Sequence, residues 1–108
     1  MTEVVLVCGR EGEFRRVSAS GHASFAARGK DIVCAAETVL LRTALEVLQK
    51  SPELEVSFDA GKRGHLSFQA SGNSRERLCC VADFLREGLG ELSKEYPGNI
   101  SFREESEN

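Results

Sequence analysis

The chain has 108 residues, of which 41% are hydrophobic and 29% are charged. This length fits one domain, and a domain of this size buries enough surface to fold without a disulfide or a metal. The formal net charge of -3 argues against DNA as a partner, because proteins that bind duplexes carry a basic surface.

The first half of the chain predicts a β-hairpin followed by a long helix. Residues 4–8 form a β-branched run that is typical of a strand, and residues 13–20 follow a glycine-containing turn as a second strand. Residues 33–50 carry apolar side chains at helical spacing, in a stripe broad enough to be covered on two sides. Asp31 precedes this stripe, and we expect it to be the N-cap of the helix.

The second half predicts another hairpin, another helix and a last strand. Apolar and polar residues alternate in residues 53–59 and again in residues 65–70, which predicts two strands with one buried face. Residues 74–96 repeat apolar side chains at helical spacing. Ile100 and Phe102 then indicate a short final strand.

The predicted order of elements is ββαββαβ. Hairpins dominate over βαβ units, so we expect an α+β fold, a two-layer α/β sandwich with a mostly antiparallel sheet and two helices. The single domain is expected over residues 1–103, and residues 104–108 are expected to form a frayed acidic tail.

The cysteines raise the question of which thiol is chemically special. No segment approaches the roughly 20 apolar residues of a membrane span, and the N-terminus lacks the features of a secretory signal. We therefore expect a cytoplasmic protein with no membrane partner, whose four cysteines are free thiols. No Cys-x-x-Cys or His-x-x-x-His pair is present, so neither a metal nor a cofactor is expected.

Residues 21–31 form a connection that is about twice the usual length, and long connections of this kind are often lids or binding loops. If Asp31 caps the helix, Cys34 lies in its first turn, where unpaired N–H groups and the helix dipole favour a thiolate. His22, at the other end of the connection, can then serve as its general acid and base. The same N–H groups are candidate donors to an oxyanion.

These residues alone leave a plainer alternative open. In that alternative, Cys34 is a small buried residue at a helix start and His22 is a polar loop residue. Asp31 has two interpretations as well, since it either caps the helix or orients His22. Cys8, Cys79 and Cys80 are interpreted as packing residues, and His65 is expected to face solvent.

Two motifs, Gly21-His22-Ala23 and Gly29-x-Asp31-Ile32-Val33-Cys34-Ala35-Ala36, stand at either end of this connection. Together they resemble the signature of the ribosomal-processing cysteine protease family, the Prp family. The resemblance covers nearly the whole chain. It implies that His22 and Cys34 form a catalytic dyad, that the fold is a small α/β sandwich, and that the protein forms a homodimer.

The resemblance also implies a substrate. In this family, the enzyme removes an N-terminal extension from large-subunit ribosomal protein twenty-seven during ribosome maturation, so the expected partner is that N-terminal peptide. A flexible substrate loop is expected to order around the peptide. In this chain the loop covers residues 23–30, which include Ala23, Ser24, Phe25, Gly29 and Lys30.

The chain departs from the family pattern directly after the second motif. Family members usually continue with Val-Ser, whereas this chain has Glu37 and Thr38. Thr38 retains a hydroxyl that can support the site. Glu37 is a helical neighbour of Cys34, and its carboxylate either disfavours the thiolate, faces solvent, or pairs with Arg28 or Lys30. A non-catalytic, ribosome-associated binding or assembly module with the same fold is therefore the alternative function.

Overall fold

The computed structural model describes residues 1–21, 28–62 and 64–107, and for residues 28–31 it describes the backbone alone. Its elements follow the predicted order ββαββαβ, and their bounds are β1 (Thr2–Cys8), β2 (Phe14–Ser20), α1 (Arg28–Gln49), β3 (Leu54–Asp59), β4 (His65–Gly72), α2 (Arg75–Glu95) and β5 (Ile100–Ser106).

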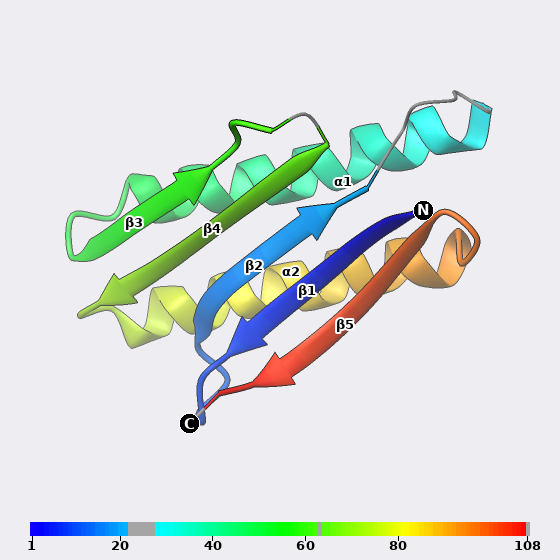
Figure 1. Ribbon diagram of the computed structural model, residues 1–108. Helices are drawn as coiled ribbons and strands as arrows, with labels where there is room; N and C mark the ends of the chain where they lie inside the picture. Colours follow the sequence, from blue (N-terminus) through cyan, green and yellow to red (C-terminus); the bar gives the residue numbers. More distant parts are fainter. Residues whose placement is uncertain (22–27, 63, 108) are drawn as a thin grey trace.

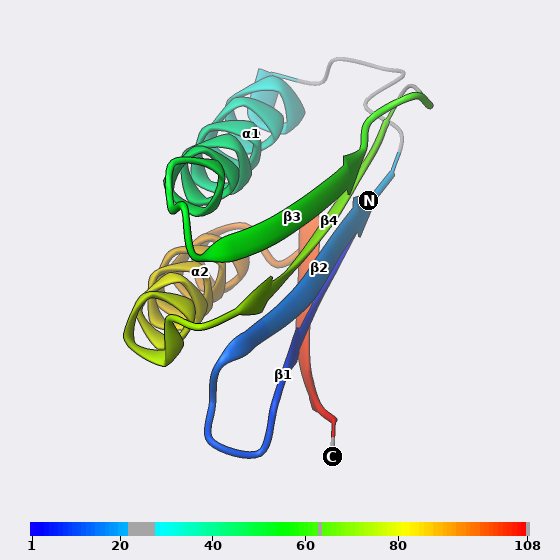
Figure 2. The same ribbon diagram turned by 90° about the vertical axis from the view of Figure 1, so that its left-hand side faces the viewer.

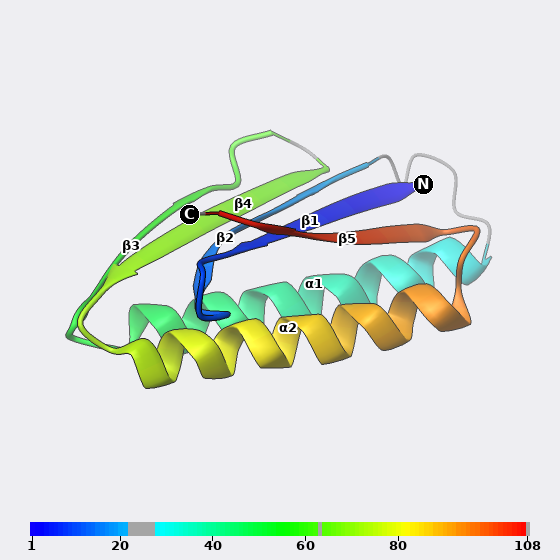
Figure 3. The same ribbon diagram turned by 90° about the horizontal axis from the view of Figure 1, so that it is seen from below.

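The strands form one five-stranded sheet in the order β3-β4-β2-β1-β5 (Figure 1). Neighbouring strands pair antiparallel except β1 and β5, which run parallel because α2 returns the chain to the far edge of the sheet. Both helices lie on the same face of the sheet, as Figures 2 and 3 show. The predicted two-layer α+β fold with a mostly antiparallel sheet is confirmed.

The core lies between the sheet and the two helices. Alternate residues of each central strand point toward the helices, so that Val4, Leu6, Val17 and Phe68 are almost fully buried. The rings of Phe14 and Phe68 stack with their centroids 5.6 Å apart. The helices supply the other half of the core through the apolar stripes that their sequences predict, with Leu41, Ala44 and Leu48 from α1 and Leu78, Val81, Ala82, Leu85 and Leu89 from α2.

The last strand is longer than its sequence predicts. We expected residues 104–108 to fray, but β5 continues to Ser106, and Glu104 is in register with Leu6 of β1. The guanidinium of Arg86 on α2 donates two hydrogen bonds of 2.8 Å to the Glu104 carboxylate. Arg16 forms an ion pair of 2.9 Å with Glu107. Cations from two other elements therefore stabilise the acidic segment against the sheet.

No described helix is long and apolar enough to cross a membrane.

Three segments meet closely where β2 ends. The Gly21 N–H donates a hydrogen bond of 3.0 Å to the Gly64 carbonyl, which brings the connection between β3 and β4 against the end of β2. A Cβ atom on Gly21 would lie 2.6 Å from the Thr2 Cα at the start of β1. Gly64 has a positive φ of 77°, a conformation that favours glycine. The segment that leads to His22 is therefore fixed by backbone contacts at Gly21.

We predict that Gly21→Ala destabilises the protein by about 1–3 kcal/mol, because the new methyl group overlaps the backbone of β1. Gly90→Ala is the matched control, since no described atom apart from its chain neighbours and the local backbone of its own helix lies within 4 Å of a Cβ there. Gly90 is inside α2, so alanine should raise stability by about 0.5–1 kcal/mol. Chemical denaturation of both variants measures the two effects, and a Gly21→Ala variant as stable as the unchanged protein would contradict the predicted overlap.

Candidate active site

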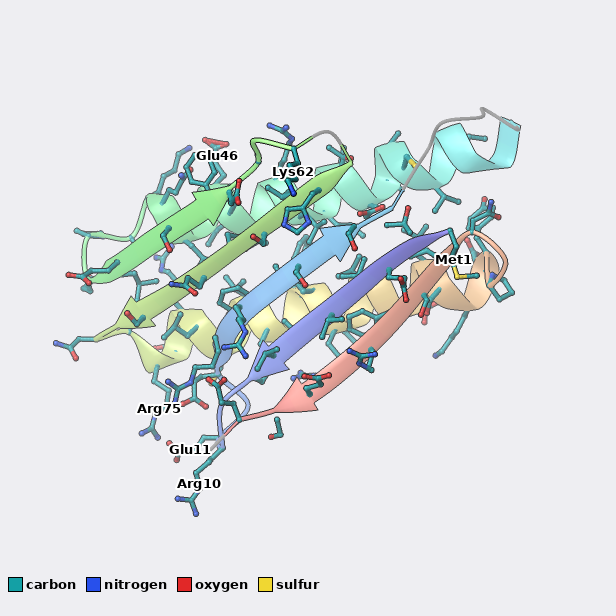
Figure 4. All side chains as sticks on the ribbon, in the orientation of Figure 1. Met1, Arg10, Glu11, Glu46, Lys62 and Arg75 are labelled. Atoms are coloured by element: carbon teal, nitrogen blue, oxygen red, sulfur yellow. The ribbon has the colours of Figure 1, made fainter. Side chains whose placement is uncertain are left out.

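A cleft of about 780 Å³ opens beside Gly21, between α1 and the ends of three strands. α1 contributes Cys34, Glu37 and Thr38 to its lining. The connection between β3 and β4 contributes Lys62, which Figure 4 places on that connection. The lining also includes Thr2, Ala19, Gly21, Leu41, Arg42 and His65.

Cys34 is the cysteine that the structure places in this cleft. Its side chain is half-buried, so a reagent or a substrate can reach it. Cys8 is buried, and burial together with the neighbouring Glu104 raises the pKa of its thiol to about 11. Cys79 is half-buried on α2. The interpretation of Cys80 as a packing residue is wrong, because its side chain is exposed on α2.

The start of α1 differs from the prediction. The helix begins at Arg28, so Asp31 lies within its first turn and is not the N-cap. Gly29 and Lys30, expected in the flexible loop, also belong to this turn. The prediction failed because a good capping residue directly before an apolar helical stripe is typical of a helix start. Here the helix continues for three more residues toward the N-terminus.

This earlier start changes the chemistry available at Cys34. The first four N–H groups of a helix lack partners within it, and in α1 these belong to residues 28–31. Cys34 is the seventh residue of the helix, beyond the first turn, where the dipole has its main effect. The helix start is therefore a weaker source of thiolate stabilisation and of oxyanion donors than the sequence predicts.

His22, Ala23, Ser24 and Phe25 lie outside the described residues, and so does the side chain of Asp31. The pairing of His22 with Cys34 and the role of Asp31 toward His22 stay predictions. The described backbone does bring the two ends of the connection to one place, since Gly21 and Cys34 line the same cleft.

Glu37 is buried in the cleft. The residue is only 8% exposed, which excludes the alternative in which it faces solvent. It lies four residues after Val33 and four before Leu41, both almost fully buried, and this spacing places all three on the inner face of α1. Burial raises the pKa of the Glu37 carboxyl to about 7. Among the described side chains, none forms an ion pair or a hydrogen bond with it. The side chains of Arg28 and Lys30, its other expected partners, are outside the described set.

The sequence interpretation did not assign two of the residues that line the cleft to the site. His65 was expected in solvent but is half-buried at the cleft, and Lys62, interpreted as a solvated basic residue of the hairpin turn, is exposed and lines the cleft as well. Their position depends on the pairing of β4 with β2, in which His65 is in register with Ser20. Thr38 is exposed and lines the cleft, and its supporting role stays a prediction. The described residues contain no group of three or more His, Cys, Asp or Glu side chains that could hold a metal ion.

We predict that stability falls as the pH rises through the range in which Glu37 ionises. The folded state binds its proton up to a pKa of about 7, whereas an unfolded glutamate releases it near 4.5. The folded state therefore holds more protons between these values, and ionising the buried acid costs about 3 kcal/mol by pH 8.

Glu37→Gln should remove this pH dependence. Denaturation at pH 4 and pH 8 tests it, because any constant effect of the amide cancels between the two measurements. Glu46→Gln, which removes an exposed carboxylate from the same helix, should leave the pH dependence unchanged (Glu46 is labelled in Figure 4). The prediction is wrong if the free energy of unfolding changes by the same amount between pH 4 and pH 8 in the Glu37→Gln variant and in the unchanged protein.

Comparison with known proteins gives a consistent result. The family described as Cysteine protease Prp matches residues 1–101. A ribosomal processing protease Prp from S. aureus, solved with a substrate peptide, is similar in fold with a TM-score of 0.83 at 20% identity, over 97% of this chain and 100% of that one. SMU.848 from Streptococcus mutans has a TM-score of 0.83 at 20% identity, over 99% of this chain and 96% of that one.

The S. aureus protease has also been solved with a covalently linked product peptide, and that structure has a TM-score of 0.82 at 21% identity, over 97% of this chain and 100% of that one. No curated protein sequence matches the chain. The structural neighbours establish the shared fold, and the family match extends over nearly all of the chain, including the cleft that contains Cys34. The chain belongs to the Prp family of cysteine proteases.

Proposed function

We propose that this protein is a cytoplasmic cysteine endopeptidase that removes the N-terminal extension of large-subunit ribosomal protein twenty-seven. The observation that carries the proposal is the position of Cys34, half-buried in a cleft of about 780 Å³ in a chain of the Prp family. The S. aureus neighbours are described as a ribosomal processing protease with substrate and product peptides, which supports a peptide as the occupant.

In the proposed reaction, the Cys34 sulfur attacks the carbonyl carbon of the scissile peptide bond and its proton passes to His22. The tetrahedral intermediate collapses when His22 gives that proton to the leaving amine, and a thioester to Cys34 remains. Water then hydrolyses the thioester, with His22 accepting the water's proton and the thiol leaving protonated. Thr38 lies one helical turn beyond Cys34 on the cleft and supports the site as a hydrogen-bonding hydroxyl.

We predict that Cys34→Ala abolishes cleavage of a synthetic peptide that spans the extension junction, because no other side chain replaces the nucleophile. His22→Ala should lower the rate by at least about 100-fold through the loss of general acid and base catalysis. Cys80→Ala, which removes an exposed thiol on α2, should retain the rate. Mass spectrometry of the products measures both the cleavage rate and the position of the cut. Full activity of Cys34→Ala would overturn the assignment of Cys34 as the nucleophile.

The alternative is a binding or assembly module with the same fold. Glu37 is the observation that favours it, because a carboxylate beside the thiol opposes thiolate formation. The same peptide distinguishes the two functions. A module binds the peptide and leaves it intact with Cys34 present, whereas the protease turns it over.

We also propose a homodimer, which the family resemblance implies. Apolar side chains lie exposed on the outer sides of the two helices, where Val39 is 63% and Phe84 41% exposed, and Ile32 and Val47 are exposed as well. A groove of about 530 Å³ between α1 and α2 is lined by Val47 and Phe84. A second copy of the chain that covers these side chains would remove them from water.

We predict that light scattering gives a mass near twice 11.8 kDa at micromolar concentration. Val39→Glu should shift the protein to a monomer, because dimerisation would bury the new carboxylate. Gln49→Glu adds the same charge to an exposed position of α1 that is not one of these apolar residues, and it should leave the mass unchanged. A monomer in the unchanged protein would refute the dimer and leave the proposed cleavage untouched.

A further inference from the structure

Cys34 and Glu37 share the cleft on one face of α1. Residues three apart on a helix have Cβ atoms about 5–6 Å from each other, so the thiol and the carboxyl are neighbours. Both side chains line the cleft, with Cys34 half-buried and Glu37 on the inner side between buried residues. A charge on one of them therefore acts on the other through a space from which water is partly excluded.

Other charged groups face the same cleft. Arg42 comes from α1, Lys62 from the connection between β3 and β4, and His65 from the start of β4. The strand residues Thr2 and Ala19 that line the cleft carry no charge. None of these three basic side chains forms an ion pair with Glu37, and burial is the cause that keeps its pKa near 7. The described cations thus leave the buried acid uncompensated.

We propose that Glu37 sets the pH range in which Cys34 reacts as a nucleophile: the protonated acid allows the thiolate to form, and the ionised acid opposes it. This inference concerns the chemistry of the thiol, and only its consequence for peptide cleavage rests on the proposed function. A carboxyl in the cleft is then compatible with a catalytic cysteine, because Glu37 is neutral at pH values below the range in which it ionises.

The size of the effect follows from the separation of the two groups. Two like charges about 6 Å apart, at the effective dielectric constant of about 20 that suits sites near a protein surface, alter an ionisation equilibrium by about 10- to 100-fold. At pH values below the range in which Glu37 ionises, its carboxyl carries no charge and this repulsion is absent.

The test measures the alkylation rate of Cys34 by iodoacetamide between pH 5 and pH 9, in the unchanged protein and in Glu37→Gln. Iodoacetamide is neutral, so the charge of the cleft acts on the thiolate and not on the reagent. Trypsin releases residues 31–42 as a peptide with Cys34 as its single cysteine, and mass spectrometry follows that residue alone. We expect the variant to react at the same rate as the unchanged protein below pH 6 and about tenfold faster near pH 8.

Two further variants separate charge from structure. Glu37→Asp keeps an ionisable carboxyl and should keep a pH-dependent ratio, whereas Glu46→Gln removes an exposed carboxylate of α1 and should match the unchanged protein. A structural disturbance would change the rate equally at every pH. A ratio that does not vary with pH, or a Glu37→Gln variant that becomes slower at pH 8, would overturn the inference.

The test also separates this inference from the proposed function. If Glu37→Gln shows the pH-dependent rise in alkylation but no form of the protein cleaves the peptide, the coupling stands and the protease proposal is wrong. If cleavage requires Cys34 while the alkylation ratio stays flat, the protease stands and the role of Glu37 is wrong. When both hold, Glu37→Gln should extend peptide cleavage to higher pH.

Discussion

The rotation of α1 about its own axis is the constraint on which the cleft depends. Val33, Leu41 and Leu48 are almost fully buried, and they reach the core in only one rotational setting of the helix. That setting turns Cys34 and Glu37 toward the cleft, because Glu37 lies one helical turn from both Val33 and Leu41, and Cys34 lies two turns before Leu41 on the same side of the helix. The core therefore orients the candidate nucleophile, although most core residues take no part in the chemistry.

The beginning of the same helix decides which interactions can activate the thiol. Since α1 begins at Arg28, Cys34 lies within the helix, where its amide is part of the regular hydrogen-bond pattern. The unpaired amides lie at least three residues earlier. A thiolate at this position must rely on side chains rather than on the helix start, so the proposed mechanism depends more heavily on His22, and any nearby negative charge is more costly.

Periodicity predicts this fold well and the site only in part. Alternation and helical spacing are local properties, so they predict all seven elements and their order. Helix and strand ends depend on partners that are distant in sequence. Arg86 is an example, because it binds Glu104 in the segment that was expected to fray. His65 enters the cleft through the pairing of β4 with β2, which no local pattern encodes. The burial of Glu37 could have been predicted from the sequence, because its spacing of four residues from both Val33 and Leu41 places it on the apolar stripe.

The burial of Glu37 connects stability with reactivity through one side chain. An ionised carboxylate on the inner face of α1 opposes folding, and its predicted cost of up to about 3 kcal/mol above neutral pH is a considerable share of the roughly 5–15 kcal/mol that stabilises a domain. An apolar residue at this position would avoid that cost and would also remove the charge that opposes the thiolate. Strongly shifted ionisable groups concentrate at functional sites, and this one lies in the cleft with the candidate nucleophile. The same proton on Glu37 therefore stabilises the helix against the sheet and keeps the cleft free of a charge that opposes the thiolate.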